Sequence, residues 1–167
     1  MKSKKFIVIL ILLILGGCSN FNFFIKETKF NNLEENNDLY YKNEKLYTGE
    51  ARSYYENKNE KVLGNFKDGK FYGEFLTYYE NGNLRSKMKF IENKLDGVKY
   101  EYYPNGNKKI IKNYKDGRLD GILTEYYENT AIKFEVRFKD DNMIGDAITY
   151  GADGSVINRI SYELDEE

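Results

Sequence analysis

Histidine and tryptophan are absent from the 167-residue sequence, and cysteine and proline occur once each. Without histidine the chain cannot form a histidine-based catalytic triad or a histidine-ligated metal site. A single cysteine excludes an internal disulfide. The 26 Lys and Arg residues are balanced by 27 Asp and Glu residues, which excludes the strong positive charge typical of nucleic-acid-binding proteins. We therefore expect a protein that is not an enzyme and that has no cofactor, metal or nucleic-acid partner.

Aromatic residues are plentiful instead, with 16 Tyr and 11 Phe making up 16% of the chain. Tyrosine favours β-strands, and a chain with a single proline turns mainly through glycine and asparagine. The length fits one domain, and a hydrophobic fraction of 41% suffices for a modest core. Composition alone thus favours an all-β fold.

The N-terminus has the features of an export signal. Three lysines among the first five residues precede an unbroken apolar run over residues 6–15. This run is too short to span a bilayer, which needs roughly 20 residues. A charged start, a short apolar run and small residues after it are typical of a secretory signal peptide. The run ends at Leu15-Gly16-Gly17, directly before Cys18.

This junction resembles the bacterial lipoprotein signal, in which Leu and two small residues precede a lipidated Cys. The resemblance implies a signal peptide over residues 1–17 and acyl chains, such as palmitate, on Cys18. At about 0.8 kcal/mol per buried methylene, several such chains would hold the protein on a bacterial cell membrane. Ser19 implies delivery to the outer membrane if the organism is Gram-negative. The alternative is an ordinary signal or a short anchor with an incidental cysteine.

Residues 18–38 are predicted to form a lipid-anchored tether. They are rich in Asn, Lys and Glu and show no clear period. A flexible chain of this length has a reach of roughly 25 Å. Two alternatives for the phenylalanines in this segment are contact with the membrane and an extra strand; these residues are Phe21, Phe23, Phe24 and Phe30.

Residues 39–167 are built from a 24-residue repeat. Glycine recurs without insertion at Gly49, Gly73, Gly97, Gly121 and Gly145. Three further series keep this spacing, namely the pairs Tyr54-Tyr55, Tyr78-Tyr79, Tyr102-Tyr103 and Tyr126-Tyr127; the aromatic residues Phe66, Phe90, Tyr114, Phe138 and Tyr162; and the large residues Tyr47, Phe71, Leu95, Leu119 and Met143. Several series in one register define five units that start near the glycines.

Each unit predicts a β-hairpin. In the second unit Asn81-Gly82 separates two strand-like runs and is typical of a two-residue type I′ turn, which needs positive φ at both central residues. Such a turn fixes the register. The inner face would then carry the pairs Tyr79–Leu84, Thr77–Ser86, Phe75–Met88 and Gly73–Phe90, and the outer face Tyr78–Arg85, Leu76–Lys87 and Glu74–Lys89. Sequences such as Lys67-Asp68-Gly69 predict a second, longer turn between units.

Together the units predict about ten short antiparallel strands in an elongated meander of stacked hairpins. Each repeated glycine lies opposite a repeated aromatic residue, so that a ring can cover a residue without a side chain. Twist is expected to curl the sheet and bury its inner face in a trough. The acidic end, residues 163–167, suits a polar cap that blunts the edge strand.

The first tyrosine of each pair and a nearby base form the candidate binding stripe. In the predicted register they meet on the outer face as Tyr54–Lys61, Tyr78–Arg85, Tyr102–Lys109 and Tyr126–Lys133. Such a stripe of rings and cations suits an acidic partner, a glycan or anionic lipid heads, or it only solubilises and stiffens an exposed face. The second tyrosines, Tyr55, Tyr79, Tyr103 and Tyr127, are predicted to lie in the core.

The pattern Gly-x-x-x-x-Tyr-Tyr-x-Asn-Gly-x-Leu, followed by an aromatic residue and x-Asp-Gly-x-Leu-x-Gly, resembles the bacterial MORN-repeat variant found in the YwqK-type antitoxin family. Residues 73–96 fit best, and the resemblance covers about residues 39–167. Asn129-Thr130 and Tyr150-Gly151 depart from the pattern. The resemblance implies β-hairpin arrays for binding or scaffolding, with toxin neutralisation in some members, and supplies no catalytic residues.

These observations predict a non-catalytic lipoprotein, moored at the cell envelope through Cys18, whose repeats bind another protein. Two other functions remain open. One is an antitoxin-like or immunity-like inhibitor, and the other is an envelope structural protein that binds glycan or anionic lipid through the stripe.

Overall fold

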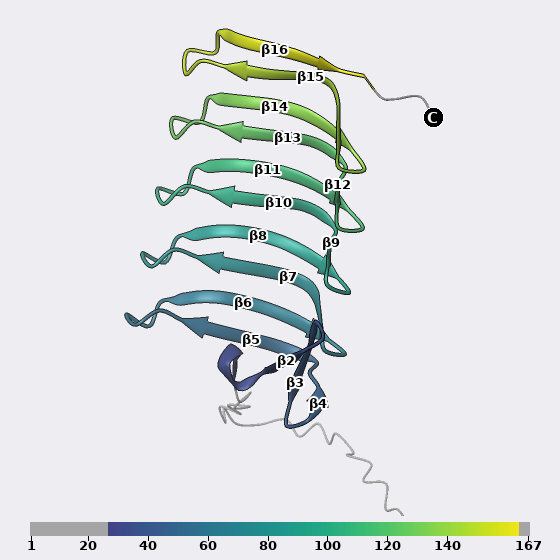
Figure 1. Cartoon of the computed structure of the whole chain (residues 1–167). Coiled ribbons are helices and arrows are strands. Elements are labelled where there is room, and N and C mark those ends of the chain that lie inside the picture. Colours follow the sequence, from purple (N-terminus) through teal and green to yellow (C-terminus); the bar gives the residue numbers. More distant parts are fainter. Residues whose placement is uncertain (1–26, 164–167) are drawn as a thin grey trace, which may run out of the picture.

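The computed structural model describes residues 27–163, which form a long, mainly antiparallel β-sheet (Figure 1). Its strands follow the order β1, β5, β6, β7, β8, β10, β11, β13, β14, β15 and β16. Their bounds are β1 Thr28–Lys29, β5 Gly49–Tyr54, β6 Glu60–Lys67, β7 Lys70–Tyr78, β8 Leu84–Ile91, β10 Gly97–Tyr102, β11 Lys108–Lys115, β13 Gly121–Tyr126, β14 Ile132–Lys139, β15 Asn142–Tyr150 and β16 Val156–Tyr162. The predicted meander of stacked hairpins is confirmed.

The predicted register holds along most of each hairpin. In the second unit Gly73 pairs with Phe90, and the ladder continues in step to Thr77 with Ser86. Since side chains alternate along a strand, Gly73, Phe75 and Thr77 lie on one face, which we call the inner face. The opposite face, which carries Leu76 and its register equivalents, is the outer face.

The Asn-Gly turn differs from the prediction. The Tyr79 amide donates to the Asn83 carbonyl at 2.8 Å, and the Gly82 amide donates to the Tyr79 carbonyl at 2.9 Å. Gly82 alone in this turn has positive φ, at 86°. This is a three-residue loop with a bulge, because a type I′ turn would need two residues of positive φ. The bulge shifts the register, so that Tyr78 pairs with Leu84 rather than with Arg85.

The type I′ turns lie between the units instead. Asp68 and Gly69 have φ of 50° and 78°, and Lys67 pairs directly with Lys70, so this turn is the shorter one rather than the longer. Asp116-Gly117 repeats it with φ of 51° and 87°. The right-handed strand twist favours this turn type, and Asp tolerates positive φ better than most residues.

After each type I′ turn the chain crosses to the next unit. The short strands β9 (Lys94–Leu95) and β12 (Arg118–Leu119) pair back on the preceding strand and run across the ends of the long strands (Figure 1). A repeated glycine then redirects the chain, as at Gly97 with φ of 96°. The predicted pairing of each glycine with an aromatic residue is confirmed, from Gly49 with Phe66 to Gly145 with Tyr162. Glycine is favoured at these positions because their φ is positive, and residues with a side chain rarely adopt positive φ.

Aromatic rings form the core on the inner face near these crossings. The ring of Phe71 lies 4.7 Å from that of Phe66 and 5.4 Å from that of Phe90, measured between centroids. Farther along the array the buried hydrophobic residues are Val136, Phe138 and Ala147, with Leu119, Leu123 and Phe134 packed against them. The inner face is therefore the buried face, as its apolar pattern predicts.

The segment before the repeats caps the first unit. β1 pairs in parallel with β5, and it leads into the 3-10 helix η1 (Phe30–Asn32). The Phe30 ring lies 5.6 Å from that of Phe66, and the Tyr40 ring lies 4.9 Å from the same ring. The strands β2 (Glu34–Asn36), β3 (Leu39–Lys42) and β4 (Lys45–Leu46) form a separate small sheet.

This cap corrects the tether prediction for its second half. Thr28 and Lys29 form a short strand, and η1 and β2 follow within the predicted tether. Phe30, the one phenylalanine of this segment among the described residues, lies in η1 and not in a strand. The physical reason is that the first unit leaves an apolar face uncovered, and the Phe30 ring fills the space above Gly64. Residues 18–26, the signal peptide and Cys18 lie outside the described residues.

The last unit is less covered. All seven residues of β16 are exposed, including Ile157 at 65% and Val156 at 54%. Apart from Glu163, the acidic cap predicted for residues 163–167 lies outside the described part of the chain. No helix within residues 27–163 is long and apolar enough to cross a membrane.

Candidate binding cleft on the inner face

Four bases stack on four tyrosines at one-unit intervals, but not on the tyrosines that the sequence predicts. The cation–centroid distances are 5.5 Å for Lys61 over Tyr55, 5.8 Å for Arg85 over Tyr79, 5.6 Å for Lys109 over Tyr103 and 6.0 Å for Lys133 over Tyr127. The expected partners, Tyr54, Tyr78, Tyr102 and Tyr126, precede these by one residue. The pairing prediction is wrong because the bulge beside each Asn-Gly-type turn shifts the register by one residue.

The second tyrosines also join consecutive units. The hydroxyl of each second tyrosine donates a hydrogen bond to a backbone carbonyl of the next unit. The acceptor is the residue at the first position of that unit's tyrosine pair. These bonds are Tyr55 to Tyr78 at 2.8 Å, Tyr79 to Tyr102 at 2.6 Å, Tyr103 to Tyr126 at 2.8 Å and Tyr127 to Tyr150 at 2.8 Å. The rings are half-buried rather than fully buried in the core. Each tyrosine therefore serves both as a clamp between units and as a platform for a cation.

Asparagine side chains at the hairpin ends form a parallel set of clamps. The amides of Asn81 and Asn83 both donate to the Pro104 carbonyl, at 3.2 and 2.8 Å. Asn57 and Asn59 make the same contacts to the next unit. This ladder was not predicted, although asparagine recurs at 24-residue spacing in the sequence.

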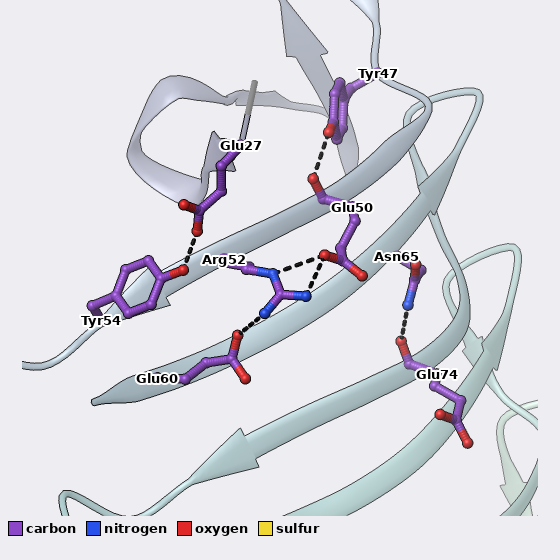
Figure 2. Close-up of polar contacts among 8 residues, drawn as sticks. All are labelled: Glu27, Tyr47, Glu50, Arg52, Tyr54, Glu60, Asn65 and Glu74. Carbon is purple, nitrogen blue, oxygen red and sulfur yellow. Dashed lines mark hydrogen bonds and ion pairs between the residues drawn. The ribbon is translucent and has the colours of Figure 1, made fainter. Parts of the chain in front are cut away.

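Within residues 27–163 no base stacks on a first tyrosine. Figure 2 shows Tyr54 on the first unit, where its hydroxyl donates to Glu27. This hydrogen bond raises the pKa of Tyr54. The neighbouring Arg52 is saturated by ion pairs with Glu50 and Glu60, both at 2.6 Å. This cluster has one cation and three carboxylates, so it is net negative, and it lies at the N-terminal end of the sheet.

Three of the four stacked bases border a cleft of about 460 Å³. Its lining comes from three consecutive units and includes two of the second tyrosines, Tyr55 and Tyr79. The lining comprises Tyr55, Lys61, Val62, Thr77, Tyr79, Arg85, Ser86, Lys99, Glu101, Tyr102 and Lys109. The hydroxyl oxygens of Thr77 and Ser86 lie 2.7 Å apart within it. Of the predicted stripe, the cleft therefore brings together Lys61, Arg85 and Lys109 with one first tyrosine, Tyr102.

The charge of the cleft is positive. Lys99 forms a salt bridge of 2.9 Å with Glu101, which neutralises both. Burial alone would raise the pKa of Glu101, but the hydrogen bond from Lys99 and the nearby lysines outweigh burial and hold that pKa below its usual value. Glu101 therefore stays ionised at neutral pH.

Three cations remain for a ligand. Lys61, Arg85 and Lys109 form no salt bridge with any residue between 27 and 163, whereas Lys133, in the fourth unit, pairs with Glu125 at 2.9 Å. The unpaired row therefore spans the first three units and ends at the fourth.

The described residues contain no group of three Asp, Glu or Cys side chains that could hold a metal ion. What the cleft does offer is a row of cations, ring faces and hydroxyl groups. These are groups for binding a polar, negatively charged ligand.

The family described as the MORN repeat variant matches residues 71–92 and 95–116. The first match begins at Phe71, after one type I′ turn, and ends at Glu92 within the next, so one match corresponds to a crossing segment plus a hairpin. Two of the repeat units are therefore similar to the MORN repeat variant. No curated protein matches the chain.

Proposed function

We propose that this protein is a non-catalytic binding module that holds a partner protein in the inner-face cleft. The main observation in support is the row of Lys61, Arg85 and Lys109. These bases stack on tyrosine rings but form no salt bridge with the described residues. A repeat array provides a rigid, extended surface of this kind, because each unit is fixed by its neighbours. The tyrosine and asparagine clamps support this rigidity.

We also propose that the module is moored at the cell envelope. This part rests on the sequence of residues 1–18, which resembles a lipoprotein signal. The test is to express the chain with Cys18 or with Cys18→Ala and to fractionate the cells. The native chain is expected in the membrane fraction with the mass of an acylated protein cut after Gly17. A native protein with an unmodified thiol would overturn the lipid anchor.

The binding function is tested by photocrosslinking in cells. A photoreactive amino acid is placed at Val62, which lines the cleft and makes no side-chain hydrogen bond, or at Lys89 on the outer face as the matched control. We expect a discrete protein adduct from position 62 that is absent from position 89. The adduct should disappear when Lys61, Arg85 and Lys109 are replaced by Glu. No adduct at either position, or equal adducts at both, would contradict the proposal.

A further inference from the structure

We propose that the cleft binds an extended acidic segment whose carboxylates recur at every third residue. This inference rests on the proposed function and specifies the partner. It follows from three properties of the cation row, which are its spacing, its length and its place in the sheet.

The spacing comes from the repeat. Lys61, Arg85 and Lys109 occupy equivalent positions 24 residues apart, on strands β6, β8 and β11. Consecutive cations are therefore two strands apart, or about 9.6 Å at about 4.8 Å per strand. A polyproline II helix rises about 3.1 Å per residue with three residues per turn, so every third side chain points the same way at intervals of about 9.3 Å. The two periods agree within a few per cent.

A β-strand does not satisfy the same condition. Its rise of about 3.3 Å gives about 9.9 Å over three residues, but side chains three apart point to opposite sides. An α-helix rises about 1.5 Å per residue, so a 9.6 Å interval would need six to seven residues. A left-handed extended segment with acidic residues at i, i+3 and i+6 therefore fits the row best.

The length of the row sets the number of carboxylates. Lys133 would be the fourth cation, but Glu125 neutralises it at 2.9 Å. The row thus offers three cations without a salt bridge to residues 27–163, over about 19 Å. A segment of about seven residues would engage all of them.

The position of the cation row beside a cleft favours an extended peptide ligand over a membrane surface. The cations border a cleft on the inner face, and its wall carries the hydroxyl groups of Thr77 and Ser86. A single file of charges along a cleft suits a linear ligand, whereas a bilayer presents its head groups in a plane. The strand amides along the row are engaged in the sheet ladder, so recognition comes from side chains.

The test uses fluorescence anisotropy with the full-length protein in detergent and fluorescein-labelled peptides. One peptide repeats Glu-Pro-Pro four times, and the control has the same composition with its four Glu residues in one block. We expect micromolar binding of the periodic peptide, at least ten-fold tighter than that of the block peptide. Salt should weaken this binding because the contacts are ion pairs.

Variants locate the site. Replacement of Lys61, Arg85 and Lys109 by Glu should abolish binding, and replacement of all three by Gln should weaken it at least ten-fold. The matched control replaces Lys67, Lys89 and Lys115 by Glu, since these exposed lysines lie on the outer face. It should leave affinity within about two-fold. Glu101→Gln removes a negative charge from the cleft and should tighten binding about two- to four-fold.

The outcomes separate this inference from the proposed function. Equal affinity for both peptides, or binding of vesicles rich in anionic lipid without binding of the periodic peptide, overturns the inference. If the peptides fail while the photoadduct at position 62 persists, the binding function stands with a different ligand. If the cleft and control variants lose peptide binding equally, the cleft is not the site.

Discussion

Replacing Tyr103 by Phe should weaken the junction between the third and fourth units. The change removes one hydroxyl, whose hydrogen bond to the Tyr126 carbonyl measures 2.8 Å. The ring remains, and so does its contact with Lys109 at 5.6 Å. The loss is therefore confined to one partly buried hydrogen bond between units.

The expected cost is that of a single intramolecular hydrogen bond. Such a bond contributes about 0.5–1.5 kcal/mol net, and the Tyr126 carbonyl loses a partner when the hydroxyl is removed. We expect the free energy of unfolding to fall by about 1 kcal/mol and the unfolding temperature to fall by about 4 °C. Tyr103→Leu should cost more, since it also removes the ring and the cation–π contact.

Urea unfolding followed by circular dichroism measures the change, with Tyr72→Phe as the matched control. Tyr72 is exposed, and its hydroxyl makes no hydrogen bond with the described residues. The control should change stability by less than about 0.3 kcal/mol. If Tyr103→Phe were as neutral as Tyr72→Phe, the clamp would not stabilise the array and the reasoning would be refuted.

Three further predictions concern the turn, the cap and the acid response. Thr130 has φ of 73°, which strains a β-branched residue, so Thr130→Gly should stabilise the protein by about 1 kcal/mol in urea unfolding. A destabilised variant would contradict the turn assignment. In Gly64→Ala the new Cβ would lie 2.8 Å from Phe30 Cζ, so the cap should detach and hydrogen exchange at residues 28–46 should accelerate while exchange in β10 and β11 stays unchanged. Protection retained at residues 28–46 would count against the cap. The pKa of Glu101 is lower in the folded than in the unfolded chain, so ionised Glu101 stabilises the fold at pH values above its unfolded-state pKa of about 4.5. This contribution is lost as the pH falls through the lower folded-state pKa. Urea unfolding between pH 7 and pH 3 should therefore show a smaller acid loss in Glu101→Gln than in the native protein, and equal losses would refute the link.

The interior of each hairpin could be predicted from the sequence because it depends on local patterns. A 24-residue period with no insertions determines which strands are neighbours, and alternation of side chains determines which face is buried. The pairing of Gly73 with Phe90 and of Thr77 with Ser86 follows from these two patterns. They also predict the apolar inner face that Val136 and Phe138 occupy.

The details at the hairpin ends could not be predicted in the same way. Asn81-Gly82 is compatible with both a two-residue and a three-residue loop, and the choice moves Arg85 from the side of Tyr78 to that of Tyr79. The three-residue loop has a contact that the sequence does not display, the hydrogen bond from the Tyr79 hydroxyl to the next unit. A one-residue shift therefore places the bases on the cleft side rather than on the outer face.

The sequence by itself determined the repeat, the strand order, the buried face and a resemblance at residues 1–18 to a lipoprotein signal, because each depends on residues near one another in the chain. Only the tertiary structure decided that residues 28–46 cap the first unit, and that Lys61, Arg85 and Lys109 border one cleft. Both results depend on contacts between units. Those contacts are set by bulges and by backbone acceptors, which are the same in every residue type and leave no mark in the sequence.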